Sequence, residues 1–258
     1  MRFNHDGGSI LEIGPGTFEV YDTINQVKLV GFVLRGAGQA YYPTDHPLDG
    51  QVTRLIWKGP KEQPMFRGSI RQGLFQDVQF VGGDIHITSM RGLGTGLCTF
   101  ERCSFFKCGV KFGDESYNGN AADSVFRDCQ WINSEYGIQL TTSQNVNYLI
   151  DNCMFYRTSK AVDVLGGGIV TMRDCYMTQV PYIYYLSGDG TKTGGHNGNF
   201  VVRDLRYDWK QDVVPTLVKD VSSYGSRVLV VDNVHSPRGI NLTDVVNSNK
   251  VIWDVKVR

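Results

Sequence analysis

The stretch Val125-Phe126-Arg127-Asp128-Cys129-Gln130-Trp131 decides the fold, because the chain repeats its pattern many times. The copies have apolar residues at the places of Phe126, Cys129 and Trp131, except for Ser236 at the last of these places in one copy, with mostly polar residues between them. The place of Asp128 is taken in turn by Asp77, Arg102, Asp128, Asn152, Asp174, Asp204, Asn233 and Asp254. Successive numbers differ by 21 to 30 residues. A repeat of roughly 20–50 residues indicates stacked structural units.

Each copy predicts two short strands joined by a bend, because its alternation of apolar and polar residues is interrupted once. Asp and Asn are the non-glycine residues that best tolerate a left-handed backbone, so a column of them marks a corner. Most copies are followed by a further short apolar pattern, at residues 85–87, 110–112, 138–140, 162–164, 183–185 and 240–242. Three strands and three corners predict one coil of a solenoid.

These repeats resemble the right-handed parallel β-helix of the pectate-lyase superfamily, which includes bacteriophage tailspikes and related virion proteins. The resemblance predicts an all-β fold, a single-stranded right-handed parallel β-helix of about eight or more coils. Residues 1–27 are expected to form an entry or cap segment and residues 28–258 the β-helix domain. In that family an asparagine column often lines the corner between the second and third sheets, and the Asp/Asn column looks like its equivalent. The same fold carries lyases, hydrolases and inert spikes, so it leaves function open.

The composition argues against binding to nucleic acid and against insertion into a membrane. Lys and Arg number 26, as do Asp and Glu, so no net charge steers the chain to nucleic acid or an anionic membrane. No apolar run reaches the ~20 residues of a membrane helix, and the first residues do not read as a signal peptide. We therefore expect synthesis in a cytoplasm, that of the host in the case of a virus. We expect no cofactor.

The six cysteines follow the repeat rather than a metal-binding motif. Cys103, Cys129, Cys153 and Cys175 share one inward position, and Cys98 and Cys108 flank the first of them. No Cys-x-x-Cys occurs, and free cysteine behaves as a small buried hydrophobe. This pattern favours a ladder of free thiols and no metal, over the alternatives of a disulfide framework or a zinc site.

The middle residue of each third strand is expected to face outward, which gives a polar strip of His86, Lys111, Gln139, Asp163, Tyr184 and Asn241. The resemblance implies that this sheet lines a substrate groove. Glycoside hydrolysis needs two carboxyl groups about 5–9.5 Å apart. Asp163 on the strip and Glu135 in the preceding corner form the candidate catalytic pair, with Asp114 or Glu115 as another source of the second carboxylate. A solvated sheet face, or sugar contact without catalysis, is the alternative.

Lyase chemistry fits this strip less well. The resemblance implies a basic residue that abstracts a proton, beside calcium held by clustered acids. Lys111 with a single Asp163 does not reproduce that cluster. The Asp residues of the corner column are numerous, but their place predicts that they bind local backbone amides.

Long loops supply the remaining candidate contacts. Insertions follow the third strand at residues 88–98, 113–123 and 187–199, and another segment, 39–50, lies near the entry end. Long loops on a regular scaffold often carry binding residues. Tyr41, Tyr42, His46, Tyr117 and His196 are therefore candidate contact residues beside the polar strip.

Two functions remain open. One is a bacteriophage virion structural protein, a capsid decoration, spike or fibre component, expected as a homotrimer that contacts other virion proteins and a cell-surface polysaccharide. β-Helices generally work outside cells, and a chain without secretion signal or disulfides reaches the outside most simply when lysis releases particles. The alternative is a polysaccharide-degrading enzyme, a glycoside hydrolase or lyase that acts in the groove of the third sheet.

Overall fold

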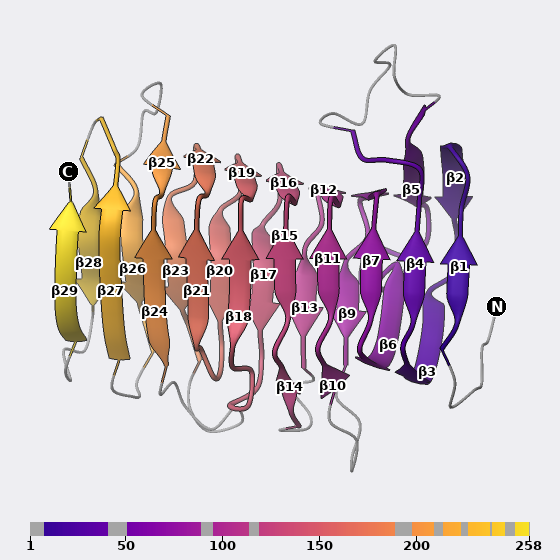
Figure 1. Cartoon of the computed structure of the whole chain (residues 1–258), viewed down its shortest axis with the longest axis horizontal. Coiled ribbons are helices and arrows are strands. Elements are labelled where there is room, and N and C mark those ends of the chain that lie inside the picture. The colour runs from indigo at the N-terminus through magenta and orange to yellow at the C-terminus, as the bar shows by residue number, and fades with distance from the viewer. Residues whose placement is uncertain are drawn as a thin grey trace.

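The computed structural model describes residues 8–40, 51–88, 95–113, 119–188, 198–208, 214–222, 227–237, 239–245 and 251–257. They form a parallel β-helix in which three sheets wind around one core; two of the sheets continue to the last coil, and the third ends at residues 206–207 (Figure 1). The predicted fold is therefore confirmed. Within the described ranges no helix is long and apolar enough to span a membrane.

Every strand pairs in parallel with its counterparts in the neighbouring coils. Sheet A consists of β1 (Ile10–Glu12), β4 (Val33–Arg35), β7 (Leu74–Gln76), β11 (Thr99–Glu101), β15 (Val125–Arg127), β18 (Tyr148–Asp151), β21 (Val170–Arg173), β24 (Asn199–Arg203), β27 (Arg227–Val234) and β29 (Val251–Val257). Sheet B consists of β2 (Gly16–Val20), β5 (Thr53–Trp57), β8 (Val78–Val81), β12 (Ser104–Phe106), β16 (Gln130–Ile132), β19 (Met154–Tyr156), β22 (Tyr176–Thr178) and β25 (Arg206–Tyr207). Sheet C consists of β3 (Ile24–Val30), β6 (Phe66–Arg71), β9 (Ile85–Ile87), β13 (Val110–Phe112), β17 (Tyr136–Leu140), β20 (Lys160–Val164), β23 (Tyr182–Leu186), β26 (Thr216–Asp220) and β28 (Asn241–Val245), with β10 (Thr95–Gly96) and β14 (Ala121–Ala122) at its edge.

The segment expected to precede the solenoid contributes its first coil. Strand β1 pairs with β4, β2 with β5 and β3 with β6, so each of the three sheets begins before residue 31. The expected boundary between residues 27 and 28 falls inside β3.

The corner between sheets A and B turns on a single residue in every described coil from β7 to β27. The residues at this position have φ between 49° and 58°, in the left-handed region; they are Asp77, Arg102, Asp128, Asn152, Asp174, Asp204 and Asn233. The backbone N–H of Asp128 donates to the Asp151 carbonyl of the next coil (3.2 Å), and Asn152 Nδ2 donates to Asp128 Oδ1 (2.6 Å). The predicted corner column is confirmed at these positions.

The prediction for Asp254 was wrong. This residue pairs with Val230 in the middle of β29, so it does not occupy a corner. The apolar pattern of the last strand continues through it for all of Val251–Val257, and the bend assumed from the repeat does not form there.

Large side chains stack in columns inside the helix because strands of neighbouring coils keep a constant register. In sheet A the rings of Phe75, Phe100 and Phe126 stack at 4.5 and 4.8 Å. In sheet B, Phe105, Trp131 and Phe155 stack at 5.1 and 4.6 Å. Such ring pairs stabilise the core beyond the burial of their area, by about 0.5–1.5 kcal/mol each.

All six cysteines are buried free thiols, as the sequence predicted. Each thiol in the main column points toward a carbonyl of the preceding coil; Cys103 Sγ lies 3.3 Å from the Phe75 oxygen. Burial raises the pKa of Cys98 to about 12 and raises those of Cys108, Cys129 and Cys175 as well. These thiols are therefore protonated core residues. The part of the chain that the structure describes holds no group of three metal-ligating side chains.

The corner conformation predicts the cost of substituting Asn152. Asn152→Ala places an alanine in the left-handed region, at about 1–2 kcal/mol, and removes the bond to Asp128. We expect the free energy of unfolding, measured in urea, to fall by about 1–2 kcal/mol. Asn152→Gly, which adopts this conformation freely, should lose less. Equal losses for the two variants would show that the backbone conformation is not the constraint.

Candidate functional site

The outer face of sheet C carries one column of polar side chains in strict register. His86, Lys111, Gln139, Asp163, Tyr185 and Lys219 follow one another from β9 to β26. The predicted strip is therefore present for its first four residues. Lys111 and Gln139 are half-buried, as is His86.

Two members of the predicted strip were wrong. Tyr184 is fully buried in register with Val162, and its hydroxyl donates to the Val201 carbonyl (3.1 Å). Leu186 takes the inward position that Val164 has in the previous coil, which turns Tyr185 outward. A shift of one residue moves each side chain of a strand to the other face. Asn241 aligns with Thr216, at the start of its strand, and not with the strip.

Asp163 is held by its neighbours rather than exposed to a groove. Its side chain is 4% exposed. Its carboxylate accepts hydrogen bonds from Gln139 Nε2 (2.9 Å), Lys160 Nζ (3.1 Å) and Ser187 Oγ (3.2 Å). Glu135 precedes Gln139, the register partner of Asp163, by four residues, which corresponds to about 13 Å along the strand. The structure does not bring the predicted catalytic pair together.

Glu135 instead lines a hollow of about 250 Å³ at the corner between sheets B and C. Asp84, His86 and Tyr136 line the same hollow, together with Lys61 and Lys107. Two predicted site residues, Glu135 and His86, are thus brought together from coils that are two strands apart. The hollow collects carboxylate, imidazole, phenol and ammonium groups, which can bind the hydroxyl or carboxylate groups of a polar ligand.

A hydrogen bond across one coil organises this hollow. The Tyr136 hydroxyl donates to Asp84 Oδ2 (2.5 Å), and the backbone N–H of Gly109 donates to Asp84 Oδ1 (2.8 Å). The tyrosine ring lies directly over Gly109, where a Cβ atom would be 2.6 Å from the ring. Burial and the carboxylate of Asp84 raise the pKa of Tyr136, so its phenol remains protonated. Asp84 thus fixes both Tyr136 and the backbone directly before β13.

Aromatic side chains lie beside the strip on β23. The rings of Tyr182 and Tyr185 meet edge to face at 5.3 Å, and Lys160 Nζ lies 4.4 Å from the centre of the Tyr185 ring. Both tyrosines are half-buried. The Lys160 ammonium also bonds Asp163, so ring pair, ammonium and carboxylate form one connected cluster. The sequence contained the signal for Tyr185: counting backward from Leu186, instead of forward from the corner, gives the correct register.

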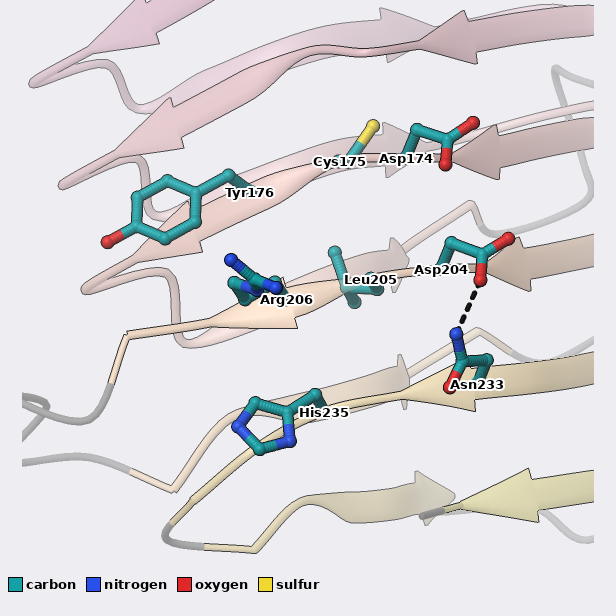
Figure 2. Close-up of a pocket in the computed structure, with 8 residues that line it drawn as sticks. All are labelled: Asp174, Cys175, Tyr176, Asp204, Leu205, Arg206, Asn233 and His235. Atoms are coloured by element: carbon teal, nitrogen blue, oxygen red, sulfur yellow. Dashed lines mark hydrogen bonds between the residues drawn. The ribbon is translucent and has the colours of Figure 1, made fainter.

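A second hollow, of about 500 Å³, lies on the corner between sheets A and B. Figure 2 shows Asp174, Asp204 and Asn233 along one side and Tyr176, Arg206 and His235 along the other. Asn233 Nδ2 donates to Asp204 Oδ1 (2.5 Å). Arg206 and His235 were not predicted from the sequence as site residues, although each lies two positions after a corner residue.

The remaining predicted contact residues, Tyr41, Tyr42, His46, Tyr117 and His196, lie outside the described residues, as do Asp114 and Glu115.

Comparison with known proteins gives the fold. No family model and no curated protein matches the chain. The crystal structure of an alginate lyase from Paenibacillus sp. str. FPU-7 is similar with a TM-score of 0.52 and 11% identity over 94% of this chain and 92% of that one. The catalytic domain of a GH87 α-1,3-glucanase in complex with nigerose gives 0.49 and 15%, over 96% of this chain and 53% of that one. The ORF18 protein of Geobacillus virus E2 gives 0.38 and 12%, over 94% and 55%. At these identities the likeness to the lyase shows a shared fold alone.

The Tyr136–Asp84 bond predicts a measurable loss of stability. Tyr136→Phe removes the hydroxyl that donates to Asp84 Oδ2, and this carboxylate oxygen loses its hydrogen bond to the tyrosine. We therefore expect the free energy of unfolding to fall by about 1–3 kcal/mol. Urea denaturation measures this loss. Tyr156→Phe, at a half-exposed tyrosine of β19, is the matched control and should change stability by less than about 0.5 kcal/mol. Similar values for the two variants would contradict the role given to Asp84.

Proposed function

We propose that the chain is a structural β-helix module of a bacteriophage particle that binds a cell-surface polysaccharide through the outer face of sheet C. The proposal joins two parts, a binding surface and a place in an assembly, which are tested separately. The binding part rests on Tyr182, Tyr185 and Lys160, with the buried Asp163 holding Lys160 in place.

The cluster is a rigid surface of the kind that sugars require. A sugar ring offers apolar C–H groups on its faces and hydroxyl groups around its rim. Tyrosine rings present apolar area at low entropic cost, and their hydroxyls form hydrogen bonds. Lys160 and Asp163 bond one another at 3.1 Å, and Lys160 also lies against Tyr185, so binding would order few side chains. A preorganised surface keeps more of its contact energy as affinity.

The surroundings of Asp163 favour binding over cleavage at this face. A hydrolase needs a carboxyl group that acts as acid, base or nucleophile, with a second carboxyl group within about 5–9.5 Å. Asp163 is buried and accepts bonds from three side chains, and Glu135 lines another hollow. The face thus offers fixed hydrogen-bonding groups rather than a catalytic pair.

A polysaccharide-degrading enzyme is the second candidate, and one specific observation favours it. Glu135, His86 and Asp84 share the hollow at the corner between sheets B and C. Glu135 is exposed there and could act as a general acid or base toward a glycan that lies along sheet C.

The assembly part of the proposal derives from the sequence. β-Helices generally act outside cells, and the six thiols remain free in this chain. Release of assembled particles by lysis brings such a chain outside without oxidative folding. We propose a homotrimer that contacts other virion proteins, made in the host cytoplasm and located in the virion as a decoration, spike or fibre component.

The binding part predicts retention of specific glycans. We expect the purified chain to bind particular members of an array of bacterial capsular and O-antigen oligosaccharides. Tyr182→Ala should weaken that binding at least about tenfold, because stacking area and the ring pair are lost. Tyr156→Ala, in which the lost ring also lies beside a cation, Arg157, at 5.0 Å, is the control and should bind normally.

The enzyme is tested on the glycans that bind. If the chain releases new reducing ends or unsaturated sugars from them, and Glu135→Gln abolishes this release, the chain is a polysaccharide-degrading enzyme and the proposal of binding alone is wrong. If the wild type and Tyr182→Ala bind the glycans equally well, the outer face of sheet C is not the binding surface.

The assembly part predicts the mass in solution. Light scattering should give three times the 28.9 kDa of the chain, independent of dilution through the micromolar range. A monomer at all concentrations would exclude the homotrimer without bearing on glycan binding.

A further inference from the structure

The corners between sheets A and B form a column along the helix axis, and we call the surface above this column the corner trough. In each coil the corner residue forms one wall, the next residue the floor, and the second residue after the corner the other wall. The hollow in Figure 2 is this trough at residues 174–176, 204–206 and 233–235.

Nearer the N-terminus the chain fills the same trough with its own backbone. The segment 36–40, which comes directly after β4, crosses the corner over β8, β12 and β16. Gly38 N donates to the carbonyl of the corner residue Asp77 (3.0 Å), and Gln39 Nε2 donates to the carbonyl of Asp128 (3.0 Å). On the opposite wall, Gln79 Nε2 (3.1 Å) and Gln130 Nε2 (2.9 Å) donate to the Ala40 carbonyl.

These hydrogen bonds show that the two walls of the filled trough differ: one wall accepts hydrogen bonds and the other donates them. Acceptors on the corner wall receive the donors of the segment, and donors on the opposite wall bind its carbonyl. Ser104, which lies between Gln79 and Gln130 in the same column, is completely buried. An extended polypeptide suits such a channel because each of its residues carries one backbone donor and one acceptor.

The open trough also has acceptors on one wall and donors on the other. The carboxylates of Asp174 and Asp204 stand on the corner wall as acceptors, and Arg206 and His235 stand opposite as donors, in register with each other. Tyr176 is 37% exposed on that second wall, and its hydroxyl donates to Asp208 Oδ2 (3.1 Å). The second wall therefore carries donors in both parts, the amides of Gln79 and Gln130 in the filled part and Arg206 and His235 in the open part. The acceptors on the corner wall are backbone carbonyls in the filled part and carboxylates in the open part.

We propose that the open trough binds an extended segment of a partner polypeptide, in the manner in which the filled trough binds segment 36–40. The backbone carbonyls of the partner accept from Arg206 and His235. A donor side chain at the place of Gln39 reaches Asp174 and Asp204, and a cationic residue suits that place best. This interaction is independent of glycan binding at sheet C.

The probe is a six-residue peptide with the sequence of residues 35–40, acetylated and amidated, together with its Gln39→Lys version. Titration into the ¹⁵N-labelled full chain should shift the amide resonances of residues 174–176, 204–206 and 233–235 in a saturable manner. The lysine version should bind about threefold tighter, because an exposed ion pair replaces a neutral hydrogen bond. The face of sheet C should remain unshifted.

Variants of the trough separate its two walls. Arg206→Gln should weaken both peptides at least about fivefold, since a charged donor is lost. Asp204→Asn, which retains a residue suited to the corner, should abolish the preference for lysine while binding persists. Arg203→Gln is the matched control, because this exposed arginine lies in the same coil outside the trough.

Three outcomes would overturn the proposal. If the peptides cause no change in the amide resonances of the trough residues, or if Arg206→Gln binds them as the wild type does, the trough does not bind a polypeptide. Trough shifts caused by a uronic acid trisaccharide, with none caused by the peptides, would assign the trough to an acidic sugar instead.

Discussion

The structure depends on one constraint: each described coil from β7 to β27 turns between sheets A and B on a single residue in the left-handed conformation. The N–H of that residue then points along the helix axis and donates to the next coil, as Asp128 does to Asp151. Only glycine adopts this conformation freely, and Asn and Asp are the side chains that tolerate it best. Because each turn takes one residue, the strands on both sides remain in register, and this register places phenylalanine over phenylalanine and cysteine over cysteine.

Constant register also decides where binding surfaces can form. Each position in a strand becomes a column along the axis, so a surface is made of one residue per coil at a spacing of about 4.8 Å. The strip on sheet C and the two walls of the corner trough are such columns. The hollow at Asp84 differs, since Tyr136 crosses an intervening coil to reach it, and Gly109 leaves the space for the ring.

Features that depend on the corner could be predicted from the sequence, whereas those whose register is set by another element could not. The parallel β-helix, the buried thiols and the corner residues up to Asn233 could all be read from one motif. Tyr184 was misplaced because the strip was counted forward from the corner, whereas the register of β23 follows from Leu186 at its end. Asn241 was misplaced because the register of β28 depends on its pairing with β26. Asp254 failed for a related reason, since a motif that resembles a corner can also continue as a strand. Contact between Tyr136 and Asp84 joins residues that are 52 positions apart, and no spacing in the chain indicates it.

The contrast between the filled and open parts of the trough suggests how one scaffold separates structural from binding surface. Where segment 36–40 covers the wall, Gln79 and Gln130 donate to the Ala40 carbonyl. The buried Arg54 lies in the same column, in register with Gln79. Where the wall is open, the same column carries Tyr176, Arg206 and His235. A buried charge is costly unless it is hydrogen-bonded, and Arg54 Nε donates to the Gln79 amide oxygen (2.6 Å). Charged groups can remain hydrated in the open part until a ligand replaces water. An extended partner segment carries donors and acceptors, so it can form hydrogen bonds with the acceptors of one wall and the donors of the other at the same time.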